Sequence, residues 1–132
     1  MLAGDAKKDK HENFAEGKQV KLGSQTYLVE SMAEGMRKTA EYILVNYPQV
    51  QNRLDDSGIA KWITRDRKQA GKKEGYFRSG KQVRTDKGEF WIGTASNLRT
   101  KKGQMENLCE LAGVEKNKIS WYEAAGQQVF QW

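Results

Sequence analysis

The fold is decided by residues 61–102, KWITRDRKQAGKKEGYFRSGKQVRTDKGEFWIGTASNLRTKK, in which short basic segments alternate with glycine turns. The stretch holds thirteen lysines and arginines against four acidic residues, a local net charge of +9. The other ninety residues hold ten basic and thirteen acidic side chains, so the net charge of +6 for the 132-residue chain is a local property. Because the glycines predict turns between ordered elements, the charge is expected on folded structure and not on one basic tail.

A helix and three strands are expected in and next to this stretch. Ser57 is a suitable N-cap for a helix that runs to Ala70, where Gly71 would stop it. A meander should follow, because turn residues separate three short segments of strand-like composition. The expected strands are Tyr76–Arg78, Gln82–Thr85 and Glu89–Thr94.

On the N-terminal side, a hairpin and a helix are expected. Alternation around a Gly-Ser turn predicts a β-hairpin over 18–30. Ser31 with Glu34 forms a capping box for a helix over 31–47, and Pro48 ends that helix.

On the C-terminal side, the pattern predicts a helix over 100–112 that stops at Gly113. Segments 118–123 and 127–132 are expected to form a terminal hairpin. The apolar ending favours a strand docked into the sheet, and the alternative is an exposed surface for a partner.

The element order indicates an α+β fold in one small domain over 18–132, preceded by a flexible arm over 1–17. We expect a mainly antiparallel sheet of two or three hairpins, packed with about three helices. One cysteine excludes an intramolecular disulfide and favours a reducing compartment. The charged N-terminus is unlike a secretory signal, and no apolar run reaches the length of a membrane span. The expected location is the cytoplasm.

Basic and aromatic residues mixed over one stretch are typical of a surface that binds a polyanion, nucleic acid above all. Lysines and arginines would neutralise phosphates, and aromatic rings would stack on unpaired bases. The sequence therefore predicts a non-enzymatic nucleic-acid-binding module for DNA or RNA. The expected phosphate contacts are Arg65, Arg67, Lys68, Lys72, Lys73, Arg78, Lys81, Arg84, Arg99, Lys101 and Lys102, and the expected stacking residues are Tyr76 and Trp91.

Two other interpretations of the same stretch stay open. The first is a protein-interaction module, an inhibitor or adaptor, that docks its basic face on an acidic protein surface. The second is a solvated surface without a ligand, in which Phe77, Val83, Phe90 and Ile92 form the core. Under the binding hypothesis, one positive ridge is expected from Arg78, Lys81, Arg84 and Lys87.

Residues 105–124, MENLCELAGVEKNKISWYEA, have a spacing that is similar to the helix-turn-helix family pattern. Cys109 is the small residue four positions before the turn glycine, Gly113. The resemblance implies a recognition helix in the major groove that presents Lys116, Asn117, Ser120 and Trp121. The alternative is a core helix followed by a strand, because the segment around Trp121 also has strand propensity.

Catalytic signals are few. His11 lies in the expected arm, and Cys109 is expected to be a small core residue, since reactive thiolates need exposure and positive neighbours. Asp55 and Asp56 would be metal ligands only under a third hypothesis, a small metal-dependent nuclease. We therefore expect no cofactor, no metal and no enzymatic activity.

Overall fold

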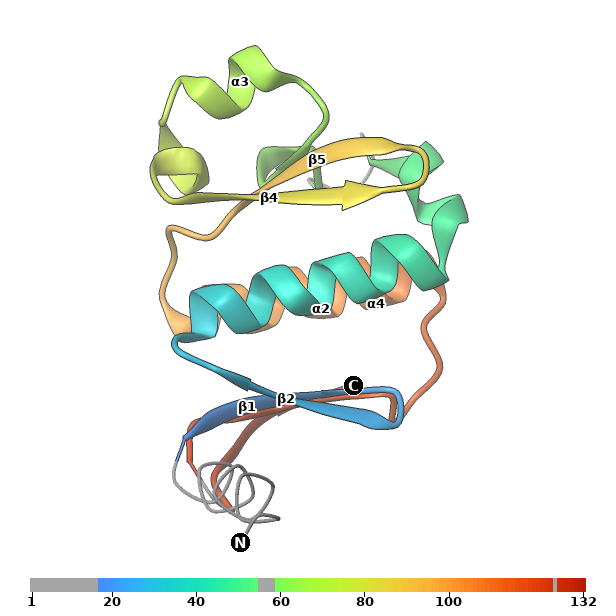
Figure 1. Cartoon of the computed structure of the whole chain (residues 1–132), viewed down its shortest axis with the longest axis vertical. Helices are drawn as coiled ribbons and strands as arrows, with labels where there is room; N and C mark the ends of the chain where they lie inside the picture. Colours follow the sequence, from blue (N-terminus) through green and yellow to red (C-terminus); the bar gives the residue numbers. More distant parts are fainter. Residues whose placement is uncertain (1–16, 55–58, 125) are drawn as a thin grey trace, which may run out of the picture. The chain divides into compact units, whose positions relative to one another are not determined.

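The protein is described by a computed structural model that covers residues 17–54, 59–124 and 126–132. It is an α+β protein with two antiparallel sheets and helices, as expected (Figure 1). The chain divides into two compact units: a terminal unit of Met1–Gly35 and Lys116–Trp132, and a central unit of Met36–Glu115. The predictions of an arm over 1–17 and one domain over 18–132 stay predictions, and residues 1–16 lie outside the described residues.

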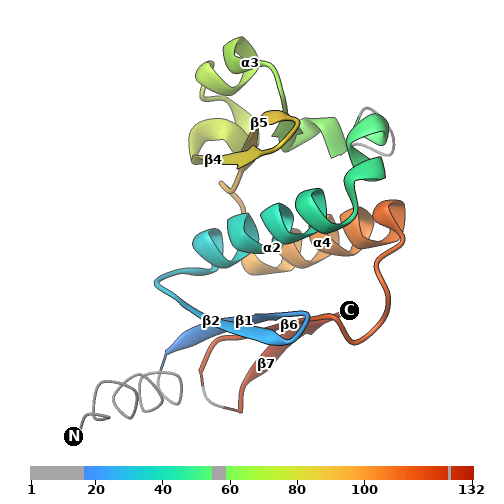
Figure 2. The same cartoon turned by 45° about the vertical axis from the view of Figure 1, so that its right-hand side comes forward.

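The terminal unit contains a four-stranded antiparallel sheet of order β2-β1-β6-β7 (Figure 2). Both expected hairpins are confirmed, and β7 is the docked terminal strand, since it pairs with β6. In this sheet Val20 lies opposite Trp121, and the Trp121 and Phe130 rings are 4.9 Å apart. The strands are β1 (Lys18–Leu22), β2 (Gln25–Val29), β6 (Ile119–Tyr122) and β7 (Gln128–Gln131).

Helix α2 (Met32–Asn46) forms where the capping box predicts it. The Glu34 backbone N–H donates to Ser31 Oγ at 3.2 Å, and the Glu34 carboxylate accepts from the backbone N–H of Glu30 at 2.9 Å. After the helix, Pro48 opens a 3₁₀ segment, η1 (Pro48–Arg53). Local sequence signals therefore fix both ends of α2.

The central unit contains a three-stranded antiparallel sheet of order β3-β5-β4: β3 (Ile63–Thr64), β5 (Gly88–Gly93) and β4 (Gly80–Thr85). Within this unit, Figures 1 and 2 show residues 36–46 of α2 and α4 (Leu98–Ala112) side by side on one side of the sheet and α3 (Arg67–Gly71) on the other. The core side chains of this sheet are Ile63, Val83, Phe90 and Ile92, all buried.

Helix α4 begins two residues before the predicted start. Asn97 accepts from the Thr100 backbone N–H at 2.8 Å and caps the helix. Gly113 ends it in the left-handed conformation, with φ of 72°.

The predicted helix from Ser57 to Ala70 is wrong. A 3₁₀ turn, η2 (Ile59–Lys61), is followed by strand β3, and only α3 is helical; Ser57 lies outside the described residues. The β-branched pair Ile63-Thr64 prefers an extended backbone, and Ile63 pairs with Ile92 on β5. A pairing distant in sequence has overridden the local helical pattern.

The predicted strand Tyr76–Arg78 is also wrong, since these residues lie in a 3₁₀ segment, η3 (Gly75–Arg78). Gly75 has φ of 54°, which turns the chain away from an extended path. The third strand of the sheet is β3 instead, so the predicted meander is not formed.

The helix-turn-helix interpretation of 105–124 is wrong, and its alternative is confirmed. The second half of the segment is strand β6, whose Ser120 and Trp121 pair with Lys21 and Val20 on β1. Trp121 is fully buried. The backbone N–H and C=O groups of this segment pair with strand β1 of the N-terminal hairpin. In a recognition helix the same groups would have paired within the helix. Among the described residues, no helix combines the length and hydropathy needed to cross a membrane.

Candidate nucleic-acid interface

The excess positive charge belongs to the central unit. This unit holds sixteen basic and ten acidic residues in its sequence, whereas the terminal unit holds seven of each. The central unit therefore carries the whole net charge of +6. A polyanion would be attracted to this unit.

Most of the predicted phosphate-binding residues are exposed. Lys102 is half-buried, and Lys101 is buried, with 6% of its surface exposed. Of the exposed residues in this predicted set, Arg84 forms an ion pair with an acid of the described residues, Glu89. The exposed set is Arg65, Arg67, Lys68, Lys72, Lys73, Arg78, Lys81, Arg84 and Arg99.

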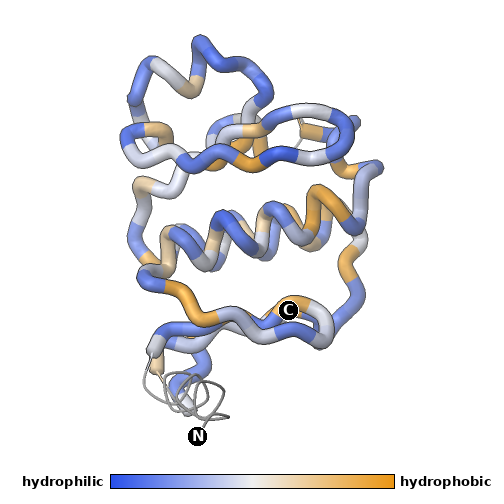
Figure 3. The backbone as a smooth tube through the Cα atoms, viewed as in Figure 1, coloured by the Kyte–Doolittle hydropathy of each residue, from blue (hydrophilic) through white to orange (hydrophobic). Residues whose placement is uncertain are grey.

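Three lysines and a tyrosine gather around one surface hollow of 630 Å³, which we call the lysine hollow. Around it, the segment of α3 is mostly hydrophilic (Figure 3). Two acids, Asp66 and Glu74, also line it, but neither lies at ion-pair distance from a described lysine. The lining residues are Lys61, Asp66, Lys68, Gln69, Lys72, Glu74, Gly75, Tyr76 and Phe77.

The start of α3 contributes Asp66, Lys68 and Gln69 to the lining of the lysine hollow. Asp66 caps this short helix by accepting from the Lys68 backbone N–H at 2.9 Å. The Asp66 backbone N–H donates to Thr64 Oγ1 at 3.0 Å, which ties the cap to strand β3. The Asp66 carboxylate therefore has a structural role at the rim.

A tight turn and a close backbone contact position the lining residues that follow α3, which include Gly75 and Tyr76. Lys73 and Gly75 both have positive φ, 57° and 54°, so the chain reverses between α3 and η3. Tyr76 then lies against Gly93 of β5, so closely that a Cβ at position 93 would be 2.8 Å from Tyr76 Cβ. The Ala95 backbone N–H donates to the Tyr76 carbonyl at 3.1 Å. Tyr76 is thus held in place by its own backbone.

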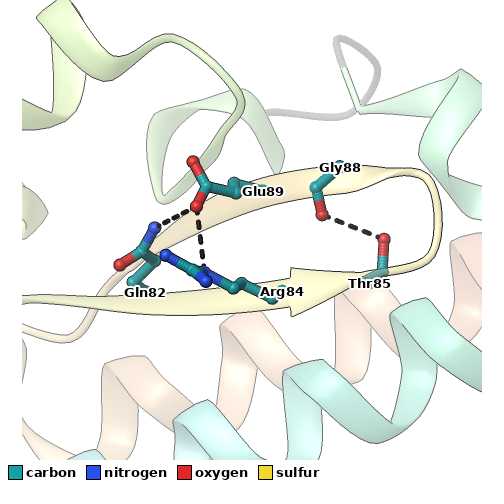
Figure 4. A network of polar contacts seen from close by, with 5 residues as sticks. All are labelled: Gln82, Arg84, Thr85, Gly88 and Glu89. Carbon is teal, nitrogen blue, oxygen red and sulfur yellow. Dashed lines mark hydrogen bonds and ion pairs between the residues drawn. The ribbon is translucent and has the colours of Figure 1, made fainter.

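The predicted basic ridge along β4 is not formed. Strand alternation puts Lys81 on the face of Val83 and Arg84 on the opposite face, which it shares with Gln82. Figure 4 shows Arg84 engaged with Glu89, with Nε and Oε2 3.0 Å apart. The same carboxylate oxygen accepts from Gln82 Nε2 at 2.8 Å.

The two predicted stacking residues differ from the other aromatic residues of the stretch. Trp62, Phe77 and Phe90 are buried in the core, whereas Tyr76 and Trp91 are half-buried. Tyr76 lines the lysine hollow, but Trp91 does not. The structure therefore brings one of the two together with the lysines.

Arg65 is exposed but anchored. Its Nη2 donates to Gln51 Oε1 at 2.9 Å, and its guanidinium carbon lies 4.9 Å from the centre of the Phe90 ring. A phosphate contact by Arg65 would therefore use the remaining donors of its guanidinium group.

Comparison with known proteins adds no family to this geometry. No family model, no curated protein and no solved structure matches the chain. The chemistry of the site therefore has to be judged from its own side chains.

Two residues of the site were missed by the sequence analysis. Lys61 is absent from the predicted phosphate contacts, yet it lines the lysine hollow. Gly93 had one signal, a glycine inside a strand, which often marks a close approach of another backbone.

Lys101 is a structural residue in this conformation. Its Nζ donates to the carbonyls of Thr94 and Ser96, so the ammonium group fastens the start of α4 to the end of β5. Ser96 Oγ also lies near, 3.5 Å from Nζ. A charged ammonium group that donates to two carbonyls cannot take a proton from this hydroxyl, so Lys101 and Ser96 do not form a base and nucleophile pair. Burial lowers the pKa of Lys101 from 10.5.

This lowered pKa predicts a pH dependence of stability. Between the folded-state pKa and 10.5, the unfolded chain binds the proton of Lys101 more fully than the folded chain does, so stability rises with pH. The difference in free energy of unfolding between the native protein and Lys101→Met should therefore grow in favour of the native protein across that window. Urea titrations at several alkaline pH values measure it, with Lys102→Met as the neighbouring control. A constant difference would show that Lys101 is not desolvated.

Among the described residues, no three His, Cys, Asp or Glu side chains are grouped as metal ligands would be. Cys109 is fully buried, which confirms the prediction of a small core residue. His11, Asp55 and Asp56 lie outside the described residues, so the nuclease hypothesis is not tested.

Proposed function

We propose that this protein is a non-enzymatic nucleic-acid-binding module and that the exposed basic surface of its central unit makes the contact. One observation carries the proposal: Lys61, Lys68, Lys72 and Tyr76 line the same hollow. The combination supplies cations for phosphates and an aromatic ring for a base. A merely solvated surface requires no such grouping.

The binding energy would come mainly from counterion release. Each lysine or arginine that neutralises a phosphate frees condensed cations, so affinity falls as salt rises. Exposed members such as Arg67, Lys73 and Arg78 have no ion-pair partner among the described acids, so no internal pair has to break first. Binding in this way needs no cofactor or metal. A cytoplasmic location is part of the proposal.

A second candidate function is docking on an acidic protein, and one observation favours it. A separate hollow of 390 Å³ is lined by apolar residues (Leu44, Val45 and Pro48), by the basic residues Arg84 and Lys87, and by Gln51, Thr85 and Asp86. Val45 is 52% exposed, so an apolar side chain is accessible at this hollow. An acidic partner with an apolar anchor would satisfy both the apolar and the basic residues.

Salt titration tests the leading proposal. Fluorescence anisotropy with labelled single-stranded and double-stranded DNA and RNA should show affinity that falls with salt. About five phosphate contacts on a single strand correspond to a loss of about 100-fold between roughly 50 and 200 mM salt.

The control for this titration is a polyglutamate of similar charge, which offers anions without bases or phosphates. No measurable binding to any nucleic acid at low salt would overturn the proposal. Equal binding to polyglutamate would favour the acidic-protein alternative. A complex recovered from nuclease-treated lysate would test that alternative directly.

A further inference from the structure

We propose that the lysine hollow holds one unpaired nucleotide, with its base on the Tyr76 ring and its flanking phosphates on Lys68 and Lys72. The protein would then prefer single strands to duplexes. This inference rests on the proposed function and names the form of nucleic acid that the site takes.

Concavity is the first argument. A volume of 630 Å³ lies within the range of about 300–1,000 Å³ that is usual for small-molecule sites. A base inside a duplex stays stacked between its neighbours, so it cannot enter a hollow without being turned out. An unpaired base can enter and stack on an aromatic side chain.

Preorganisation is the second argument. Tyr76 is positioned through its backbone, because Gly93 lies against its Cβ and carbonyl carbon and the Ala95 N–H bonds its carbonyl oxygen. The backbone and Cβ from which the ring projects are therefore fixed at the hollow before a ligand arrives, which lowers the entropy cost of binding. Its half-buried state leaves part of its surface for a base.

The helices of the basic stretch provide the third argument, because neither α3 nor α4 suits the major groove. The basic helix α3 has five residues, about 7.5 Å in length, which is too short for a recognition helix. Helix α4 has fifteen residues, but Glu106 and Glu110 are exposed on it and would repel phosphates. A duplex would therefore contact this surface through its backbone alone.

The test compares a labelled strand of about twelve nucleotides, within the usual site sizes, with the same strand annealed to its complement. DNA and RNA versions of the strand show which of the two nucleic acids binds more tightly. The variants are Tyr76→Ala, Tyr76→Leu and Tyr76→Phe, with Tyr27→Ala as control, since Tyr27 is an exposed tyrosine of the terminal unit.

We expect the native protein to bind the single strand more tightly than the duplex. Tyr76→Ala and Tyr76→Leu should weaken single-strand binding by roughly 5- to 150-fold, whereas Tyr76→Phe, which keeps the ring, should retain it. Duplex binding should not change. A 2-aminopurine base in the strand should be quenched by the native protein but not by Tyr76→Leu.

The variants separate stacking from folding. Alanine keeps the Cβ that packs on Gly93, and leucine also keeps apolar bulk, so the comparison of Tyr76→Leu with Tyr76→Phe decides the matter if Tyr76→Ala unfolds. Two results would overturn this inference but not the proposed function. In the first, salt-dependent binding to the single strand is unchanged when the Tyr76 ring is removed. In the second, the native protein binds the duplex more tightly than the single strand. Absence of binding to either form would overturn both the inference and the proposed function.

Discussion

Gly93→Ala is expected to lower the free energy of unfolding by about 3 kcal/mol and to disrupt the lysine hollow. An added Cβ would lie 2.8 Å from Tyr76 Cβ, 2.9 Å from its carbonyl carbon and 3.0 Å from its carbonyl oxygen. Two of these three atoms are backbone, so no side chain can rotate away to make room. The structure can respond only by moving η3 or β5.

Strand β5 is poorly able to move. It is the central strand of its sheet, between β3 and β4, and the Gly93 N–H donates to the Trp62 carbonyl at 2.7 Å. A shift of η3 would displace Tyr76 from the hollow. Urea unfolding followed by tryptophan fluorescence measures the stability, and anisotropy measures the accompanying loss of single-strand binding.

Gly103→Ala is the matched control, because a Cβ there meets nothing within 4 Å. Gly103 lies inside α4, where alanine has the better helix propensity, so this variant should gain up to about 1 kcal/mol. If Gly93→Ala proved as stable as the native protein, the close contact with Tyr76 would be wrong.

Sequence patterns predicted the elements whose signals are local. The capping box of Ser31 and Glu34 fixed the start of α2, and Gly113 fixed the end of α4. Each signal acts within one turn of helix, so it can be recognised without knowing what the helix contacts.

Prediction failed where pairing distant in sequence decided the conformation. Trp62 and Ile63 fit an apolar helix face, yet Ile63 pairs with Ile92, twenty-nine positions later. The strand segment around Trp121 was ambiguous for the same reason, since β1 is its partner. Intrinsic preferences are weak beside the ladder and burial that such a pairing supplies.

The candidate site was predicted in part. The positive charge of the stretch can be counted directly from its sequence. The lysine hollow, in contrast, depends on the positive φ of Lys73 and on the close contact between Gly93 and Tyr76, and the amino-acid composition predicts neither feature. Lys101 did have a signal: it lies four and seven positions before Met105 and Leu108, on the buried side of α4. Helical periodicity would have separated it from the exposed set.

Replacing Lys61, Lys68 and Lys72 together by glutamine is expected to weaken single-strand binding by about 50-fold at about 150 mM salt. On a single strand each neutralised phosphate contributes a slope of about 0.7 to the dependence of log affinity on log salt. With Lys61 on the next phosphate of the strand, beside those on Lys68 and Lys72, the slope should fall by about 2. All three lysines are exposed, and none has an ion-pair partner among the described acids, so stability should change little.

A control with the same change of net charge separates a site from general attraction. Lys18, Lys21 and Lys118 lie in the terminal unit, and their replacement by glutamine removes three charges at the expense of one weak pair, Lys18 with Glu123 at 3.8 Å. If phosphates sit in the lysine hollow, this variant keeps most of the affinity and the salt slope. If both triple variants lose affinity equally, attraction follows total charge, and the grouping of lysines around Tyr76 does not define the binding site.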